Sequence, residues 1–136
     1  MNILFLCTGN SCRSQIAEGW AKHFSNGTFD IQSAGIEAHG KNPLAIQAMR
    51  DAGVDISGQE STKLNEVMLN DADVVVTVCA NADELCPDLP VKIRRLHWPL
   101  SDPAKAAGTD EYVQQVFVES RDDIKNRVQQ LLEGLV

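Results

Sequence analysis

Long apolar runs are scarce in this sequence, and their scarcity limits the kinds of protein it can encode. The apolar run near the start covers only residues 3–6, and no basic residues precede it. A secretory signal needs a longer apolar stretch behind a basic region, and a membrane-spanning helix needs about 20 apolar residues. We therefore expect a soluble cytoplasmic protein that does not bind a membrane.

Basic charge is also scarce. The chain has 12 Lys and Arg against 19 Asp and Glu, which gives a net charge of −7. No basic stripe appears beyond residues 92–95, so nucleic acid is not expected as a partner. Within that short run we expect Arg94 and Arg95 to lie on a solvated face. Because the net charge repels anions, an anionic ligand would have to be captured by a local field.

The chain shows no internal repeat, linker or low-complexity tract. Its 136 residues and apolar fraction of 43% suit one globular domain with a sizeable core, spanning 1–136. Apolar runs of strand type alternate with segments of helical periodicity. We expect strands at 2–6, 28–33, 73–78 and 91–96, and helices at 14–25, 43–52, 64–69 and 110–133. This alternation predicts an α/β fold in three layers, with about four parallel strands and helices on both faces.

The most informative stretch is CTGNSCRS, residues 7–14, between the first expected strand and the first expected helix. Backbone N–H groups of such a loop can converge on a tetrahedral oxyanion, and the following helix start adds a positive dipole end. Arg13 offers a planar fork of donors to two anion oxygens. The same field would hold Cys7 as a thiolate, the nucleophilic form. The oxyanion-binding loop is expected to comprise Thr8, Gly9, Asn10, Ser11, Cys12 and Arg13.

Two other candidates follow later strands. Cys79 comes after the Val-rich strand, and Asp102 comes after the last strand. Because ligands bind at the carboxyl ends of parallel strands, we expect both to approach the loop. In a cytoplasmic protein, four cysteines favour catalysis, redox chemistry or metal binding over a static disulfide framework. Their spacing fits a zinc site poorly. Cys12 is either a packed small residue or a protective partner of Cys7.

These residues resemble the thioredoxin-coupled arsenate reductases, which share the low-molecular-weight tyrosine phosphatase fold. The resemblance covers nearly the whole chain. The loop alone does not separate reductase from phosphatase, and the pair Cys79 and Cys86 makes the reductase interpretation specific. Further matching segments are residues 15–20, 33–37, 39–40, 42–43, 55–57, 86–87, 97–98 and 102–103.

The resemblance implies a first chemical step at the loop. Cys7 would attack arsenate, while Arg13 and the loop amides would stabilise the trigonal-bipyramidal transition state. Ser14 would hydrogen-bond the Cys7 thiolate and stabilise it. Asp102 would act as general acid toward the leaving oxygen. Phosphate or sulfate would serve as arsenate mimics in the same loop.

The resemblance also implies a relay of thiols. Cys79 would attack the sulfur of the Cys7–arsenic adduct, so that arsenite leaves and a Cys7–Cys79 disulfide forms. Cys86 would then attack Cys79, and thioredoxin would reduce the Cys79–Cys86 disulfide; glutaredoxin is the alternative donor. Cys79 and Cys86 are seven positions apart. A helix between them would rise about 10.5 Å, whereas a disulfide needs Cα atoms within about 7 Å. We therefore predict that residues 80–88 are helical when reduced and looped when oxidised.

Some members of this family bind potassium beside the loop. The matching residues here are Asn10, Glu18 and Ser33, but Thr62 stands where an acidic ligand is expected. The site would thus have lost a charge, and Glu18 would only support the loop. No other metal or cofactor is expected.

Two alternative functions stay open. The first is a low-molecular-weight phosphatase using Cys7, Arg13 and Asp102, although Tyr112 is the only aromatic residue that follows Asp102 closely. The second is a non-enzymatic oxyanion or redox sensor. We expect a monomer, a structural role for His97 and Trp98, and a solvated position for His39.

Overall fold

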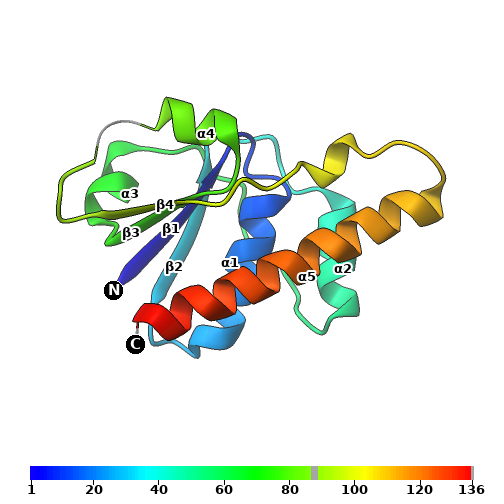
Figure 1. Cartoon of the computed structure of the whole chain (residues 1–136), viewed down its shortest axis with the longest axis horizontal. Coiled ribbons are helices and arrows are strands. Elements are labelled where there is room, and N and C mark those ends of the chain that lie inside the picture. The colour runs from blue at the N-terminus through cyan, green and yellow to red at the C-terminus, as the bar shows by residue number, and fades with distance from the viewer. Residues whose placement is uncertain (87–88, 136) are drawn as a thin grey trace.

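A four-stranded parallel sheet organises the fold, with the strand order β2-β1-β3-β4 (Figure 1). The computed structural model describes residues 1–86 and 89–135. The strands are β1 (Asn2–Cys7), β2 (Asp30–Gly35), β3 (Val74–Thr77) and β4 (Arg94–His97). The parallel α/β architecture predicted from the alternating pattern is confirmed.

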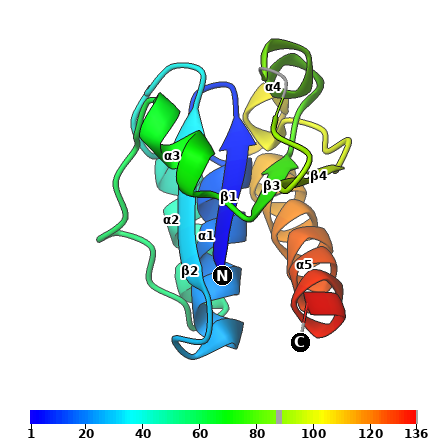
Figure 2. The same ribbon diagram turned by 90° about the vertical axis from the view of Figure 1, so that its left-hand side faces the viewer.

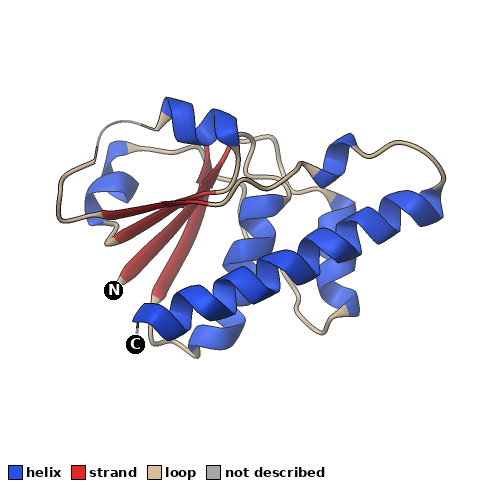
Figure 3. Ribbon diagram, viewed as in Figure 1, coloured by secondary structure: helices blue, strands red, loops and turns tan. Residues whose placement is uncertain are grey.

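Helices cover both faces of this sheet. Figure 2 shows α3 (Glu66–Asp71) in front of the strands, and α1 (Arg13–Ser25) and α2 (Pro43–Asp51) behind them. The long helix α5 (Asp110–Leu135) packs against α1 and α2, and its C-terminal end points toward the viewer beside the strands. The short helix α4 (Ala80–Leu85) contacts β1 and β3, and a 3-10 turn, η1 (Pro103–Lys105), precedes α5 (Figure 3). Among the described residues, no helix combines the length and apolar character needed to cross a membrane.

The central strands are buried because both of their faces are covered. Side chains of β1 from Ile3 to Leu6 are at most 2% exposed, and the three valines of β3 are at most 1% exposed. Such strands read as continuous apolar runs rather than alternating ones, which is why the sequence revealed them. Between the two helices α1 and α5, the indole N–H of Trp20 in α1 donates to the Arg121 carbonyl of α5 at 3.1 Å.

The topology places several loops at one edge. From β1 the chain reaches β2 on one side, and later β3 on the other. The loop after β1 therefore lies at the point where the strand order reverses, which is where open α/β sheets bind ligands. The segments that follow β3 and β4 begin at the same edge, because all four strands are parallel.

Several expected boundaries shift by two or three residues. The second strand is Asp30–Gly35 rather than 28–33, because Thr28 N–H turns back to the Ser25 carbonyl at 2.9 Å. The last strand is Arg94–His97 rather than 91–96, because Ile93 N–H closes a turn onto Pro90. The third helix begins at Glu66 rather than 64, because the Asn65 side chain caps it.

The remaining elements agree more closely with the expectation. The helices expected at 14–25 and 110–133 are Arg13–Ser25 and Asp110–Leu135, and the strand expected at 73–78 is Val74–Thr77. The segment expected to be helical at 80–88 forms a helix only over Ala80–Leu85, with Cys86 as its C-cap. Positions 87–88 of that expectation lie outside the described residues.

Candidate active site

The loop from Cys7 to Ser14 is held by its backbone carbonyls. Segments after β2 donate N–H groups to these carbonyls: Ile36 to Cys7 (3.0 Å), Glu37 to Thr8 (2.9 Å), His39 to Gly9 (2.9 Å) and Asn42 to Ser11 (3.1 Å). The C=O and N–H of a trans peptide point in opposite directions. With its carbonyls turned toward this segment, the loop directs N–H groups to its inner side, as an anion-binding loop requires.

Two small residues permit this close packing. A Cβ on Gly35 would lie 2.2 Å from the Glu37 carbonyl oxygen and 2.7 Å from the Asn10 nitrogen, both backbone atoms. A Cβ on Gly9 would lie 2.5 Å from Nδ1 of His39. Asn10 itself adopts a positive φ of 50°, which asparagine tolerates better than most residues.

Cys7 is buried at the base of the loop with donors around its sulfur. The Asn10 N–H donates to Sγ at 3.1 Å, and the Ser14 hydroxyl lies 2.9 Å from Sγ. Nδ2 of Asn10 donates to Oγ of Ser14 at 2.8 Å. Because the Ser14 oxygen already accepts that bond, its own proton is free to point at the sulfur. This arrangement stabilises a thiolate at Cys7.

Arg13 and Asp102 face each other across the mouth of the loop. Nη2 of Arg13 is 3.8 Å from Oδ2 of Asp102, and Nη1 donates to the Leu100 carbonyl at 3.1 Å. Oδ1 of Asp102 accepts the Ala104 N–H at 3.0 Å, which fixes the carboxylate at the start of η1. A cavity of about 290 Å³ lies here, and its lining comprises Cys7, Thr8, Gly9, Ser11, Cys12, Arg13, His39, Asp102 and Ala104.

Cys12 shares this lining but differs from Cys7 in its surroundings. Burial raises the pKa of the Cys12 thiol to about 11, and the Ser11 hydroxyl opposes the shift only in part. The thiol therefore stays protonated at neutral pH. A protonated thiol is a poor nucleophile, which disfavours Cys12 as the attacking group.

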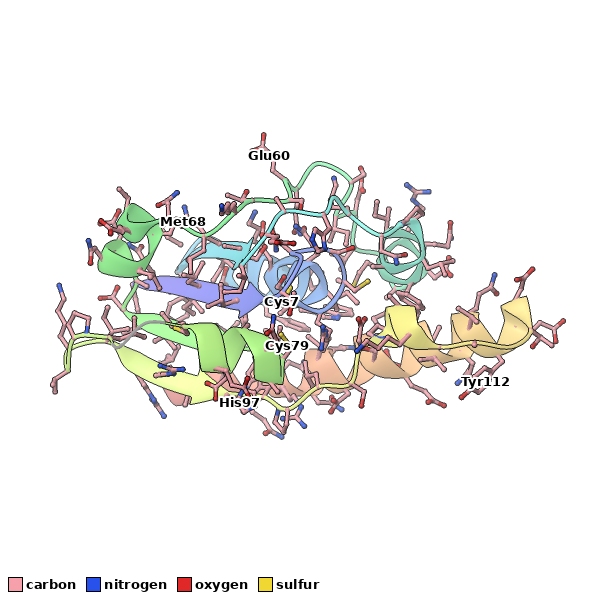
Figure 4. The ribbon with its side chains drawn as sticks, turned by 90° about the horizontal axis from the view of Figure 1, so that it is seen from above. Cys7, Glu60, Met68, Cys79, His97 and Tyr112 are labelled. Carbon is pink, nitrogen blue, oxygen red and sulfur yellow. The ribbon has the colours of Figure 1, made fainter. Side chains whose placement is uncertain are left out.

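Cys79 lies beside the loop, as Figure 4 shows for its position next to Cys7. It is the N-cap of α4, and its sulfur accepts the Ala82 N–H at 3.4 Å. The Thr8 hydroxyl is 3.2 Å from the same sulfur and accepts a bond from Nδ2 of Asn81 at 3.1 Å. Cys79 is thus connected to Thr8, the residue adjacent to Cys7. The Thr8 hydroxyl and the Ala82 N–H are two donors that can stabilise a thiolate at Cys79.

Cys86 lies at the other end of the same helix. It is buried, and its N–H donates to the Ala82 carbonyl at 2.9 Å. Burial raises the pKa of its thiol above the ordinary value, while Arg95 opposes this shift. All four cysteines are free thiols. The helical segment between Cys79 and Cys86 is therefore found together with reduced cysteines.

The residues expected to form a potassium site lie together behind the loop. Nδ2 of Asn10 donates to the Ser33 hydroxyl at 2.9 Å, and that hydroxyl donates to Oε1 of Glu18 at 2.5 Å. The other Glu18 oxygen pairs with the Lys22 ammonium at 2.5 Å. Thr62 contributes its backbone N–H to Oδ1 of Asn10 at 2.7 Å. A potassium ion would have to displace these donors, so the residues fit a supporting hydrogen-bond network rather than a cation site.

Three side chains outside the loop add polar contacts. His39 is exposed, as expected, and it also lines the cavity and pairs with Glu37 at 2.6 Å. Arg95 is exposed, as expected, and it also binds Asp83 at 3.0 Å. Nδ1 of His97, for which a structural role is expected, lies 2.8 Å from the Thr77 hydroxyl. Within residues 1–86 and 89–135, no three His, Cys, Asp or Glu side chains are grouped as metal ligands would be.

Sequence comparison identifies the family and several relatives. The family model described as low molecular weight phosphotyrosine protein phosphatase matches residues 2–136. The arsenate reductase of Halalkalibacterium halodurans is 51% identical over 131 residues, which cover 96% of this chain and 94% of the relative. The arsenate reductase of Bacillus subtilis strain 168 is 50% identical with the same coverage.

Structure comparison gives the same result. An arsenate reductase in the phosphate binding state superposes with a TM-score of 0.82 at 33% identity, covering 99% of this chain and 98% of the other. The thioredoxin-dependent arsenate reductase of Corynebacterium glutamicum gives a TM-score of 0.78 at 25% identity, covering 98% of this chain and 60% of the other.

Proposed function

The chain belongs to the low molecular weight phosphotyrosine protein phosphatase family, and we propose that it works as an arsenate reductase that regenerates Cys7 by a thiol relay. One observation supports this proposal more than any other. Cys79 is hydrogen-bonded to Thr8, next to the nucleophile, and Cys86 ends the helix that Cys79 begins. A phosphatase would use the loop but would have no task for these two thiols.

The first step forms a sulfur–arsenic bond. The Cys7 thiolate attacks the arsenic of hydrogen arsenate, and an arsenic–oxygen bond breaks. Asp102 gives its proton to the departing oxygen, which leaves as water. Arg13 turns from the Leu100 carbonyl and Asp102 toward the anion, where its guanidinium and the loop amides carry the charge of the transition state.

The second step transfers electrons to arsenic. The Cys79 thiolate attacks Sγ of Cys7, so a sulfur–sulfur bond forms and the sulfur–arsenic bond breaks. The bonding pair stays with arsenic, which goes from As(V) to As(III) and leaves as arsenite after taking up protons. The Thr8 hydroxyl and the Ala82 N–H stabilise the attacking thiolate before this step.

The third step releases Cys7 and requires α4 to unwind. Cys86 attacks Sγ of Cys79, which frees the Cys7 thiolate and leaves a Cys79–Cys86 disulfide. A helix separates two residues seven apart by about 10.5 Å, beyond the roughly 7 Å that a disulfide spans. The six residues of α4 must therefore leave the helical conformation.

An external dithiol then reduces the Cys79–Cys86 disulfide. Thioredoxin is the proposed reductant, because the C. glutamicum neighbour is named thioredoxin-dependent; glutaredoxin is the alternative. Phosphate and sulfate would compete with arsenate for the loop. The proposed setting is the cytoplasm, where thiols stay reduced, and the proposed state is a monomer.

Phosphate-ester hydrolysis is a second candidate activity, supported by the family and by the loop itself. Cys7, Arg13 and Asp102 would serve it without change. Tyr112, the aromatic side chain nearest in sequence to Asp102, is exposed at the start of α5 and lies far from Cys7 in Figure 4. The cavity therefore offers little to grip an aryl group, so this activity should be weak.

The test couples arsenate reduction to NADPH through thioredoxin and thioredoxin reductase. Wild type should turn over, whereas Cys79→Ser and Cys86→Ser should lose catalytic turnover and keep hydrolysis of p-nitrophenyl phosphate. Cys7→Ser should lose both activities. Sustained arsenate reduction by the Cys79 or Cys86 variant would refute the relay.

A further inference from the structure

Asp83 in the middle of α4 joins the helix to two strands. Its carboxylate oxygen Oδ1 accepts from Nη2 of Arg95 at 3.0 Å and from the Thr77 hydroxyl at 3.1 Å. The Thr77 oxygen lies 2.8 Å from Nδ1 of His97. Thr77 belongs to β3, and Arg95 and His97 belong to β4. We call this group of Asp83, Arg95, Thr77 and His97 the Asp83 clasp.

Arg95 also binds the backbone of the helix. Its Nη2 donates to the Asp83 carbonyl at 2.5 Å. The last four carbonyls of an α-helix have no partner within the helix, and in α4 the Asp83 carbonyl is one of them. A cation at this end also suits the negative end of the helix dipole. Arg95 therefore caps α4 and binds its side chain at the same time.

We propose that the Asp83 clasp holds the redox helix folded, and that it thereby sets how readily Cys79 and Cys86 form their disulfide. This proposal rests on the relay described above. Asp83 and Arg95 are positioning residues, since they act on the thiols through the conformation of α4. The clasp stabilises the dithiol form only, because the disulfide form cannot keep the helix that the clasp binds.

The helix needs such support because it is short. Six residues are far fewer than the roughly 12–15 that an isolated helix requires in water. Ala80, Asn81 and Glu84 are exposed, and Ala82 supplies the buried contact of the helix interior. Among the described side chains, the polar anchors of the helix are the Cys79 cap, the bond from Asn81 to Thr8 and the Asp83 clasp.

The Cys79 cap and the Asp83 clasp are released in order during the relay. When Cys79 bonds to Cys7, its sulfur is no longer a thiolate, so its bonds to Ala82 and Thr8 weaken. The clasp then still holds the part of α4 next to Cys86, and it keeps Cys86 at the far end of the helix. Its release lets Cys86 approach, and it separates Arg95 from the Asp83 carboxylate. The Arg95 guanidinium lowers the pKa of Cys86, whereas the Asp83 carboxylate raises it. Once separated from Asp83, the guanidinium is free to favour the Cys86 thiolate.

The size of the effect follows from the exposure of the pair. The side chains of Arg95 and Asp83 are 33% and 36% exposed, so solvent screens their attraction. The Thr77 bond and the capping of the Asp83 carbonyl add to it. Loss of the clasp should raise the equilibrium constant for disulfide formation about three- to tenfold, in the range that one exposed ion pair and one hydrogen bond contribute.

The experiment titrates the Cys79–Cys86 pair in glutathione redox buffers, in full-length protein carrying Cys7→Ser and Cys12→Ser so that only this pair reacts. Acid quenching, alkylation and mass spectrometry give the oxidised fraction. Asp83→Ala should shift the equilibrium toward the disulfide by three- to tenfold, and Arg95→Gln should shift it in the same direction. Glu84→Ala is the matched control, since it removes one exposed carboxylate from the same helix, and it should shift the equilibrium less than twofold.

The outcomes separate the two proposals. If the pair oxidises but Asp83→Ala and Arg95→Gln match Glu84→Ala, or shift toward the dithiol, the clasp is refuted and the relay stands. If wild-type Cys79 and Cys86 form no disulfide in any buffer, the relay fails and the clasp fails with it. Circular dichroism of the reduced variants checks folding, and the Arg95 variant keeps the test valid should Asp83→Ala unfold.

Discussion

Ser14→Ala should slow the chemistry of Cys7 by an amount that follows from its hydrogen bonds. The Ser14 hydroxyl lies 2.9 Å from Sγ and is fully buried, and the Asn10 amide directs its proton toward the sulfur. A hydrogen bond to a charged group contributes about 1.5–3 kcal/mol. Its loss should weaken the stabilisation of the Cys7 thiolate by about this amount.

Part of this loss is offset. A thiolate that loses a hydrogen bond is a better nucleophile, with a Brønsted coefficient of about 0.4–0.5. Together, the two effects predict that the rate of Cys7 alkylation at neutral pH falls about three- to tenfold. Arsenate turnover at neutral pH should fall by a similar factor.

The assay is alkylation by iodoacetamide, with the Cys7 peptide quantified by mass spectrometry across a pH series. Ser33→Ala is the matched control, because Asn10 also donates to Ser33, yet Ser33 does not touch the sulfur. It should leave the Cys7 rate within about twofold. Equal rates for wild type and Ser14→Ala at neutral pH would refute the idea that this hydroxyl stabilises the thiolate.

Three other predictions concern single residues of the site. Burial raises the pKa of Cys12 from 9.0 to about 11, so the folded protein should lose stability as pH rises from 9 toward 11. Over this range the unfolding free energy of Cys12→Ala should fall about 2 kcal/mol less than that of wild type. An equal fall in both proteins would contradict the raised pKa of Cys12. Gly35→Ala should destabilise the protein by about 3 kcal/mol in urea unfolding, because the new Cβ meets backbone atoms, whereas Gly58→Ala meets open space and should change little. Asp102→Asn should lower kcat for arsenate reduction about 100-fold or more, and a wild-type kcat would exclude this carboxylate as the general acid.

The loop and the central strands were predictable because their signals are local. The apolar run of β1, the CTGNSCRS loop and the start of α1 are contiguous, and the backbone between them has few alternatives. The gathering of Cys79 and Asp102 at the same edge followed from a general property of parallel sheets. The boundaries of β2 and β4 were not predictable, since turns closing on Ser25 and Pro90 decide them.

The Asp83 clasp and the position of His39 were beyond the sequence for another reason. Asp83 and Arg95 are twelve residues apart on different elements, and each alone has the pattern of a solvated charge. His39 reaches the cavity because its segment runs alongside the loop and donates to Gly9. Contacts of this kind depend on tertiary placement, so residue type and spacing do not reveal them.

We propose that the loop selects the oxyanion while the distant pair of cysteines, Cys79 and Cys86, supplies the electrons. A single-turnover experiment tests it directly: reduced enzyme is mixed with arsenate in the absence of any reductant, quenched and mapped by mass spectrometry. Wild type should release about one arsenite per chain and carry a Cys79–Cys86 disulfide, and Cys86→Ser should release arsenite but stop at Cys7–Cys79. Release of arsenite without either disulfide, or a Cys7–Cys12 disulfide in their place, would contradict the claim.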